Sequence, residues 1–144
     1  MKNEKEENIE FQIKGIEILD SFLKTPKQVI PKGIAYQFDM KIEHRVDVEK
    51  KFVMVLTSAS CFVDKDQEDL SRFKSSCIYY LPQLEKYINK ETKALDLPEQ
   101  FLISINSISI STTRGLMFSF LKGTFLHNAV IPIVNPIAFK MEGK

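Results

Sequence analysis

The sequence predicts an α+β fold in which a four-stranded antiparallel sheet packs against one long C-terminal apolar helix. Two observations predict this class. Apolar and polar residues alternate through much of the first half of the chain, which is typical of strands with one buried face. After Pro98 the period changes, and a long apolar stretch runs to Gly123, as in a helix with a proline start and a glycine stop. With 144 residues, the chain fits a single domain over 1–144, in which residues 1–8 are predicted to be disordered.

The first strand is predicted over residues 9–22, with a change of phase at Gly15. A slip of one residue would turn every later side chain to the other face of the sheet. A bulge at a glycine absorbs such a slip, so we expect one strand that bends in its middle. Pro26 and Pro31 then bracket a loop that crosses to the next strand.

Three further strands are predicted over residues 34–48, 52–63 and 70–81, and their short connections indicate an antiparallel meander. The first of them alternates most strictly, with apolar residues at even positions and polar ones at odd positions. His44 falls on its apolar face, where a hydrogen-bonded core or groove-edge histidine is favoured over a metal ligand. The charged run at 64–69 lacks the spacing of a calcium loop and predicts a solvated hairpin turn.

The helix predicted after Pro98 contains a segment, 103–110, that also has strong β propensity. Its uninterrupted length favours the helix. Such a helix is apolar around most of its girth, apart from a thin stripe of Ser104, Ser107, Ser111 and Arg114. It therefore needs cover on a second side, either from another subunit or from the apolar, proline-containing tail at 124–139.

Composition excludes several classes of function. A net charge of +1 argues against nucleic-acid binding, and two His with two Cys cannot form a four-ligand zinc site of the usual spacing. The sequence has no Gly-rich phosphate loop and no serine nucleophile elbow, so neither an enzyme nor a cofactor is expected. It also lacks a signal peptide and a membrane-spanning run, which predicts a cytoplasmic protein with Cys61 and Cys77 reduced.

The order of these elements resembles SecB, the bacterial preprotein export chaperone, and its SecB-like relatives. Residues 11–16 (FQIKGI) are similar to the opening strand of that family, and 57–60 (TSAS) end a strand where the family has its third. Residues 120–125 (FLKGTF) resemble the exit from the family's long helix. Pro132 and residues 135–139 (NPIAF) resemble its return towards a second helix.

The resemblance implies a dimer of dimers that holds unfolded polypeptides in an apolar groove without ATP. Export members of the family carry a second full helix and an acidic tail that help to dock SecA. This chain instead ends in a short basic segment at 140–144, which argues against SecA as a partner. A role in export, in a toxin–antitoxin system or as a stand-alone holdase therefore stays open.

Two sets of candidate residues follow. The substrate-binding groove is predicted to contain apolar residues near the crossover loop and the tail: Tyr36, Phe38, Phe125, Ile131, Val134 and Phe139. The oligomer interface is predicted to contain apolar residues of the helix: Phe101, Ile105, Ile108, Met117 and Phe120. Two other functions are weighed against the chaperone: binding of a small apolar ligand between sheet and helix, and a purely structural oligomerisation module.

Overall fold

The structure, a computed structural model, describes residues 8–27, 29–63 and 68–139. The expectation of disorder at 1–8 and of a solvated turn at 64–69 falls almost wholly outside these ranges. Four strands, one α-helix and two short 3-10 helices follow in the order β1 (Gln12–Leu23), β2 (Gln37–Asp47), β3 (Phe52–Phe62), β4 (Ser71–Tyr80), η1 (Leu84–Tyr87), α1 (Glu99–Leu121) and η2 (Pro136–Ala138).

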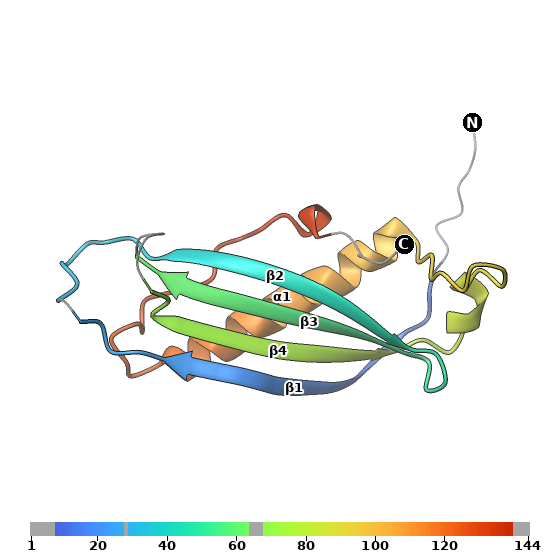
Figure 1. Cartoon of the computed structure of the whole chain (residues 1–144), viewed down its shortest axis with the longest axis horizontal. Coiled ribbons are helices and arrows are strands. Elements are labelled where there is room, and N and C mark those ends of the chain that lie inside the picture. Colours follow the sequence, from blue (N-terminus) through green and yellow to red (C-terminus); the bar gives the residue numbers. More distant parts are fainter. Residues whose placement is uncertain (1–7, 28, 64–67, 140–144) are drawn as a thin grey trace.

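The four strands form one antiparallel sheet in the order β1-β4-β3-β2 (Figure 1). The meander predicted for the last three strands is confirmed, and β1 joins it by pairing with β4. Because β1 and β2 lie at opposite edges, the chain between them must cross one end of the sheet. The crossover loop, residues 24–36, makes this connection.

The bend predicted in the first strand is confirmed. The register between β1 and β4 shifts between Ile13 and Gly15, and it shifts a second time between Ile18 and Asp20. A Cβ at Gly15 would lie 3.4 Å from Cδ1 of Ile78, so the glycine also lets the two strands approach closely. The strict alternation of β2 is likewise confirmed, because its even positions are partly buried and its odd positions are exposed up to Arg45.

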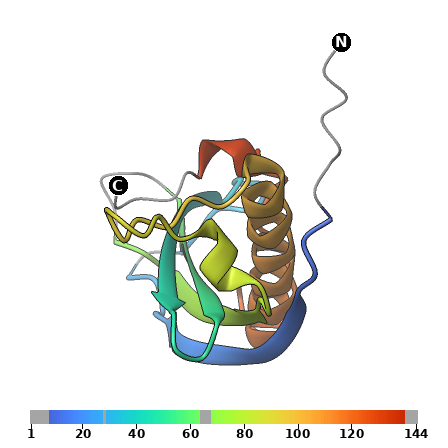
Figure 2. The same cartoon turned by 90° about the vertical axis from the view of Figure 1, so that its right-hand side faces the viewer.

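Helix α1 covers one face of the sheet, which curves around it (Figure 2). Pro98 stands at its N-cap and Lys122 at its C-cap, and Gly123 follows with a φ of +81°, a conformation that favours glycine. The helical interpretation of residues 103–110 is therefore correct. The helix packs mainly on β3 and β4, the two central strands.

The core between α1 and the sheet is divided into two apolar clusters. The first surrounds Phe101 and Ile105 near the start of the helix, and the second surrounds Met117 and Leu121 near its end. Buried polar side chains lie between them, among them Thr57 and Ser75 of the sheet and Asn106, Ser109 and Thr113 of the helix. Such a division is unusual, because buried polar groups need hydrogen-bond partners to offset their desolvation.

The segment after α1 doubles back along the helix side of the sheet towards β2 and ends at η2 (Figure 1). Leu126, Ala129 and Ile131 are buried in the second cluster. The tail thus covers part of the helix, one of the two arrangements predicted from the sequence. The tail, which contains two prolines, forms no strand.

Candidate functional site

An apolar hollow of about 400 Å³ lies at the crossover loop. Its apolar lining comes from Pro26, Val29, Ile30, Pro31 and Ile34 of the loop and from Val63 and Leu70 at the end of the β3–β4 hairpin, and Thr25 and Lys27 add polar groups. An ion pair between Lys24 and Glu68 lies at its polar side. Val29 is 93% exposed, so the hollow, called here the crossover hollow, presents apolar surface to the solvent.

Three of the predicted groove residues come together next to the crossover hollow. Tyr36 and Phe38 are partly buried and pack against the second core cluster, which contains Ile131. Leu70 packs against the same cluster and also lines the crossover hollow, so the two regions are continuous. The hollow, the cluster and the tail therefore meet at one end of the sheet.

The other predicted groove residues are more scattered. Phe125 is 39% exposed in the turn that follows α1. Val134 is half-buried in the extended tail. Phe139 lies further along, and its carbonyl accepts a hydrogen bond from Nδ2 of Asn106.

The extended part of the tail is held by side chains of α1 rather than by backbone pairing. Arg114 donates from Nε to the carbonyl of Ile131 at 2.8 Å and from Nη2 to that of Pro132 at 2.9 Å. Asn106 holds the far end at the carbonyl of Phe139, at 2.9 Å. We call residues 129–139 the strap. Sequence reasoning placed Arg114 in a polar stripe and missed its part in fixing this segment.

A second apolar surface lies on β1. Ile13, Ile16, Ile18 and Leu23 lie opposite β4 residues that face the helix, so they project from that same face of the sheet. Because α1 packs on the two central strands, this row has no cover: the side chains of Ile16 and Ile18 are 49% and 57% exposed. The outer side of α1 adds Ile108 and Phe118, which are 39% and 49% exposed.

The predicted interface residues divide between the inside and the outside of the chain. Phe101, Ile105 and Met117 are 5% exposed or less and pack within the core, so the structure places them against the chain's own sheet rather than on a free surface. Phe120 is partly buried, with its ring 5.7 Å from that of Phe73. Ile108 remains exposed. A helix apolar nearly all round gives no sequence signal for which side faces inwards.

Polar side chains where the two clusters meet form hydrogen-bonded pairs. We call His44, Ser75, Tyr79, Asn106, Ser109 and Thr113 the polar seam. The hydroxyls of Ser75 and Thr113 lie 2.7 Å apart, and those of Tyr79 and Ser109 lie 2.8 Å apart. The spacing of Asn106, Ser109 and Thr113 on the helix is the sequence signal for this seam, and the predicted polar stripe of Ser104, Ser107, Ser111 and Arg114 does not include it.

His44 is hydrogen-bonded, as predicted. Its Nε2 lies 2.7 Å from Oδ1 of Asn106. Because Nδ2 of Asn106 donates to the carbonyl of Phe139, Oδ1 must be the acceptor, so His44 donates from Nε2. Its Nδ1 and the hydroxyl of Thr57 are buried without a partner among the described residues. One chain of contacts thus joins β2, the helix and the end of the strap.

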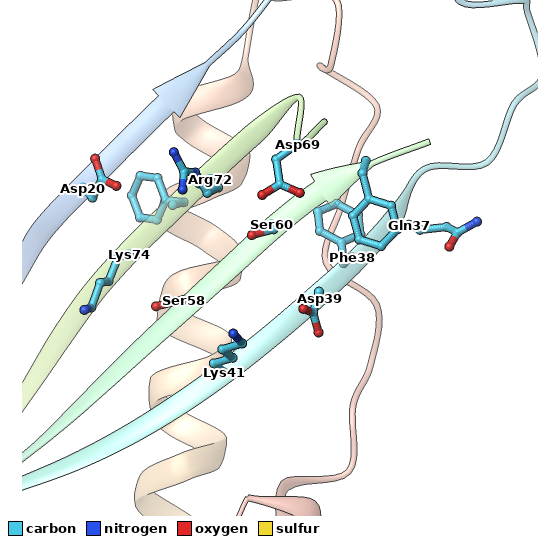
Figure 3. Close-up of a pocket in the computed structure, with 12 residues that line it drawn as sticks. Asp20, Gln37, Phe38, Asp39, Lys41, Ser58, Ser60, Asp69, Arg72 and Lys74 are labelled. Atoms are coloured by element: carbon cyan, nitrogen blue, oxygen red, sulfur yellow. The ribbon is translucent and has the colours of Figure 1, made fainter. Parts of the chain in front are cut away.

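The face of the sheet away from α1 carries a different surface, an open hollow of about 810 Å³ (Figure 3). In one cross-strand row, Lys41 pairs with Ser58 and Ser58 pairs with Lys74. The charged residues that line the hollow are Asp20, Asp39, Lys41, Asp69, Arg72 and Lys74. Three cations and three carboxylates leave it without net charge, so it has no evident preference for a charged ligand. Both hollows lie outside the interface between helix and sheet, where a small-ligand pocket was considered.

Cys61 lies in the second cluster, fully buried. Burial, with a smaller effect of the Asp69 charge, raises the pKa of its thiol from 9.0 to about 12. Between about pH 9 and 12 the thiol is therefore protonated in the folded state and ionised in the unfolded state. Ionisation favours the unfolded state, so the free energy of unfolding falls as the pH rises through this range. We expect the free energy of unfolding to fall by up to about 1.4 kcal/mol more per pH unit in the wild type than in Cys61→Ala.

Urea unfolding at several pH values from 8 to about 10.5 measures this difference in slope. The cavity left by the alanine lowers the free energy of unfolding of the variant by the same amount at every pH, so it does not change the slope of that free energy against pH. Parallel slopes for the two proteins would contradict the assigned pKa shift.

The features that set this architecture are the four-stranded antiparallel sheet, the single long helix on one face and the apolar segment that returns along that helix. The fold is that of the SecB-like chaperones. One solved structure with this fold is the SecB-like chaperone Rv1957 of Mycobacterium tuberculosis in complex with a ChAD peptide from the HigA1 antitoxin. The two chains are 13% identical with a TM-score of 0.56, over 86% of this chain and 90% of the other. The resemblance noted in the sequence is thus confirmed at the level of the fold.

No protein-family model and no curated protein sequence matches the chain. In the described part of the chain, no helix is both long and apolar enough to span a membrane.

Proposed function

We propose that this protein is an ATP-independent chaperone that binds non-native polypeptides along an apolar surface. The observation that carries the proposal is the crossover hollow, whose apolar lining continues through Leu70 to the cluster that holds Tyr36, Phe38 and the start of the strap. Exposed apolar surface of this extent is a liability unless it has a use in binding. Support also comes from the fold, because the SecB-like chaperone of M. tuberculosis with this fold holds a peptide.

The chemistry of this surface suits clients of varied sequence. Apolar side chains bind by area and shape, and they need no particular polar partner on the client. Of the predicted groove residues, Tyr36, Phe38 and Ile131 lie at the second cluster, Val134 and Phe139 lie further along the strap, and Phe125 is exposed in the turn that follows α1. Extended clients also offer backbone groups that donor side chains can bind.

We propose further that the chain associates with itself through the row of β1. Ile13, Ile16, Ile18 and Leu23 form an uncovered apolar edge next to the outer side of α1, where Ile108 and Phe118 are also accessible. A second copy with the same row would cover both edges at once, as in an isologous dimer. This assigns the interface to β1 and to the outer helix side, in place of the inward-facing Phe101, Ile105 and Met117.

Suppression of client aggregation tests the chaperone proposal. A chemically unfolded protein is diluted into buffer without nucleotide, and its aggregation is followed by light scattering. Stoichiometric wild-type protein is expected to suppress most of the scattering. No suppression at any ratio up to tenfold excess would overturn the proposal.

Two variants locate the binding surface. Phe125→Ser and Tyr36→Ser are expected to need several times more protein for the same suppression, because each removes apolar contact worth about 1 kcal/mol or more. Val48→Ser is the matched control, since Val48 is 49% exposed in the turn at the other end of the sheet. Equal loss in all three variants would contradict this location.

A further inference from the structure

The strap has the features of a bound peptide, although it belongs to the same chain. Among the described residues, positions 130–134 take part in no backbone-to-backbone hydrogen bond. Side chains of α1 donate to three backbone carbonyls of the strap, those of Ile131, Pro132 and Phe139. The segment is thus seated on a preformed surface, as an extended ligand would be.

Burial along the strap is concentrated at its start. Ala129 and Ile131 are 4% and 3% exposed, whereas Val130, Ile133 and Ile137 are 47%, 96% and 50% exposed. Ile131 is therefore the principal apolar anchor, set in the cluster with Met117 and Leu121. Loss of one such anchor affects the seating of the strap far more than any change at its exposed positions.

The hydrogen bonds to the strap have a chemical consequence for what can bind there. Arg114 and Asn106 present donors, and the strap offers carbonyl acceptors. Proline has a carbonyl but no N–H, so it loses nothing at a site that reads only carbonyls. Proline also favours an extended backbone such as that of the strap before η2 begins at Pro136.

We propose that the strap is a built-in occupant of the client site, and that this site selects extended, proline-tolerant apolar segments by their carbonyl groups. A client segment and the strap then compete for Arg114, Asn106 and the pocket of Ile131. This inference rests on the proposed chaperone function and names its substrate class. Client affinity then depends on how firmly the strap is seated. A client binds only to molecules whose site is open, so its apparent affinity is reduced in proportion to the fraction of such molecules.

The test uses the full chain and a labelled synthetic peptide with the sequence of residues 129–139, AVIPIVNPIAF. Ile131→Ser removes the main apolar anchor of the strap and leaves the donors Arg114 and Asn106 in place, and fluorescence anisotropy is expected to show about tenfold tighter peptide binding than for the wild type. Ile133→Ser is the matched control, and its affinity is expected to equal that of the wild type. Equal affinity in all three proteins would overturn competition by the strap.

Two comparisons test the carbonyl recognition. In the Ile131→Ser background, Arg114→Met is expected to weaken peptide binding about tenfold, because it removes two charge-assisted donors. A peptide with both prolines replaced by alanine, AVIAIVNAIAF, is expected to bind no more tightly than the original. An unchanged affinity for the Arg114→Met protein, or tenfold tighter binding of the alanine peptide, would overturn the proposed selectivity.

A labelling experiment keeps the proposal testable if Ile131→Ser does not fold. Ala129→Cys places a thiol at the first residue of the strap, which is 4% exposed and packs in the second cluster. Saturating peptide is expected to accelerate its alkylation at least about tenfold, with the wild type measuring the background of Cys61 and Cys77. Peptide binding without acceleration would contradict displacement. If the strap tests fail while client aggregation is still suppressed, only this inference is wrong; if aggregation is not suppressed, the proposed function is wrong.

Discussion

Ile16→Asp combined with Ile18→Asp is expected to convert the protein from an oligomer into a monomer. Both side chains lie in the uncovered row of β1 and are about half exposed in the single chain. In a symmetric dimer each substitution acts twice, so the loss of apolar contact weakens association by about 4 kcal/mol, or about a thousandfold in the dissociation constant. Carboxylates placed in an apolar interface add a desolvation cost in the same direction.

Size-exclusion chromatography with light scattering measures this change directly. The wild type is expected at twice or four times the mass of one chain, and the double variant at the mass of one chain. Val48→Asp provides the control, because it makes the same chemical change at an exposed valine remote from the β1 row. A monomeric wild type, or a double variant with the wild-type mass, would contradict the proposed interface.

Asn106→Leu is expected to lower the free energy of unfolding by about 3 kcal/mol, although leucine has a similar volume. Its amide joins His44 to the carbonyl of Phe139, so the substitution leaves two partly buried polar groups without their partners. The cost comes from the groups left behind, since an unsatisfied buried donor or acceptor loses its hydration without compensation.

Urea unfolding followed by circular dichroism measures the loss, with Ser104→Ala as the control on the exposed side of the same helix. The control is expected to change stability by less than about 0.5 kcal/mol. The double substitution His44→Leu with Asn106→Leu is expected to recover part of the loss, because it removes the orphaned imidazole. An Asn106→Leu protein as stable as the wild type would show that this hydrogen-bond chain adds nothing to stability.

The sheet and the helix could be predicted because their signals are local. The alternation over 34–48 sets which face of β2 is buried, and Gly15 marks the slip in β1. Pro98 and Gly123 bracket the helix, and its uninterrupted length outweighs the β propensity of residues 103–110. Each of these features depends on residues that are near one another in the chain, so a single sequence is sufficient to find them.

The surfaces could be predicted only in part, because they depend on how the elements pack. Whether Ile16 or Phe101 is buried is decided by the position of α1 over β3 and β4, which no periodicity determines. Arg114 and Asn106 bind carbonyls of residues 17 to 33 positions later, and such contacts have no side-chain pattern to reveal them. The groove prediction did place Tyr36, Phe38 and Ile131 in one region, since all three lie near the crossover loop or the tail.

The polar seam also has a consequence for how the molecule opens. It separates an apolar cluster that contains η1 from another that contains the start of the strap. Hydrogen-bonded polar contacts fix a geometry, but they contribute less hydrophobic stabilisation than packed apolar side chains. We therefore expect the two clusters to unfold less cooperatively with each other than the parts of one continuous apolar core would. The half of the core beneath the strap is then expected to open locally while the half beneath η1 stays folded, which would expose the proposed binding surface without global unfolding.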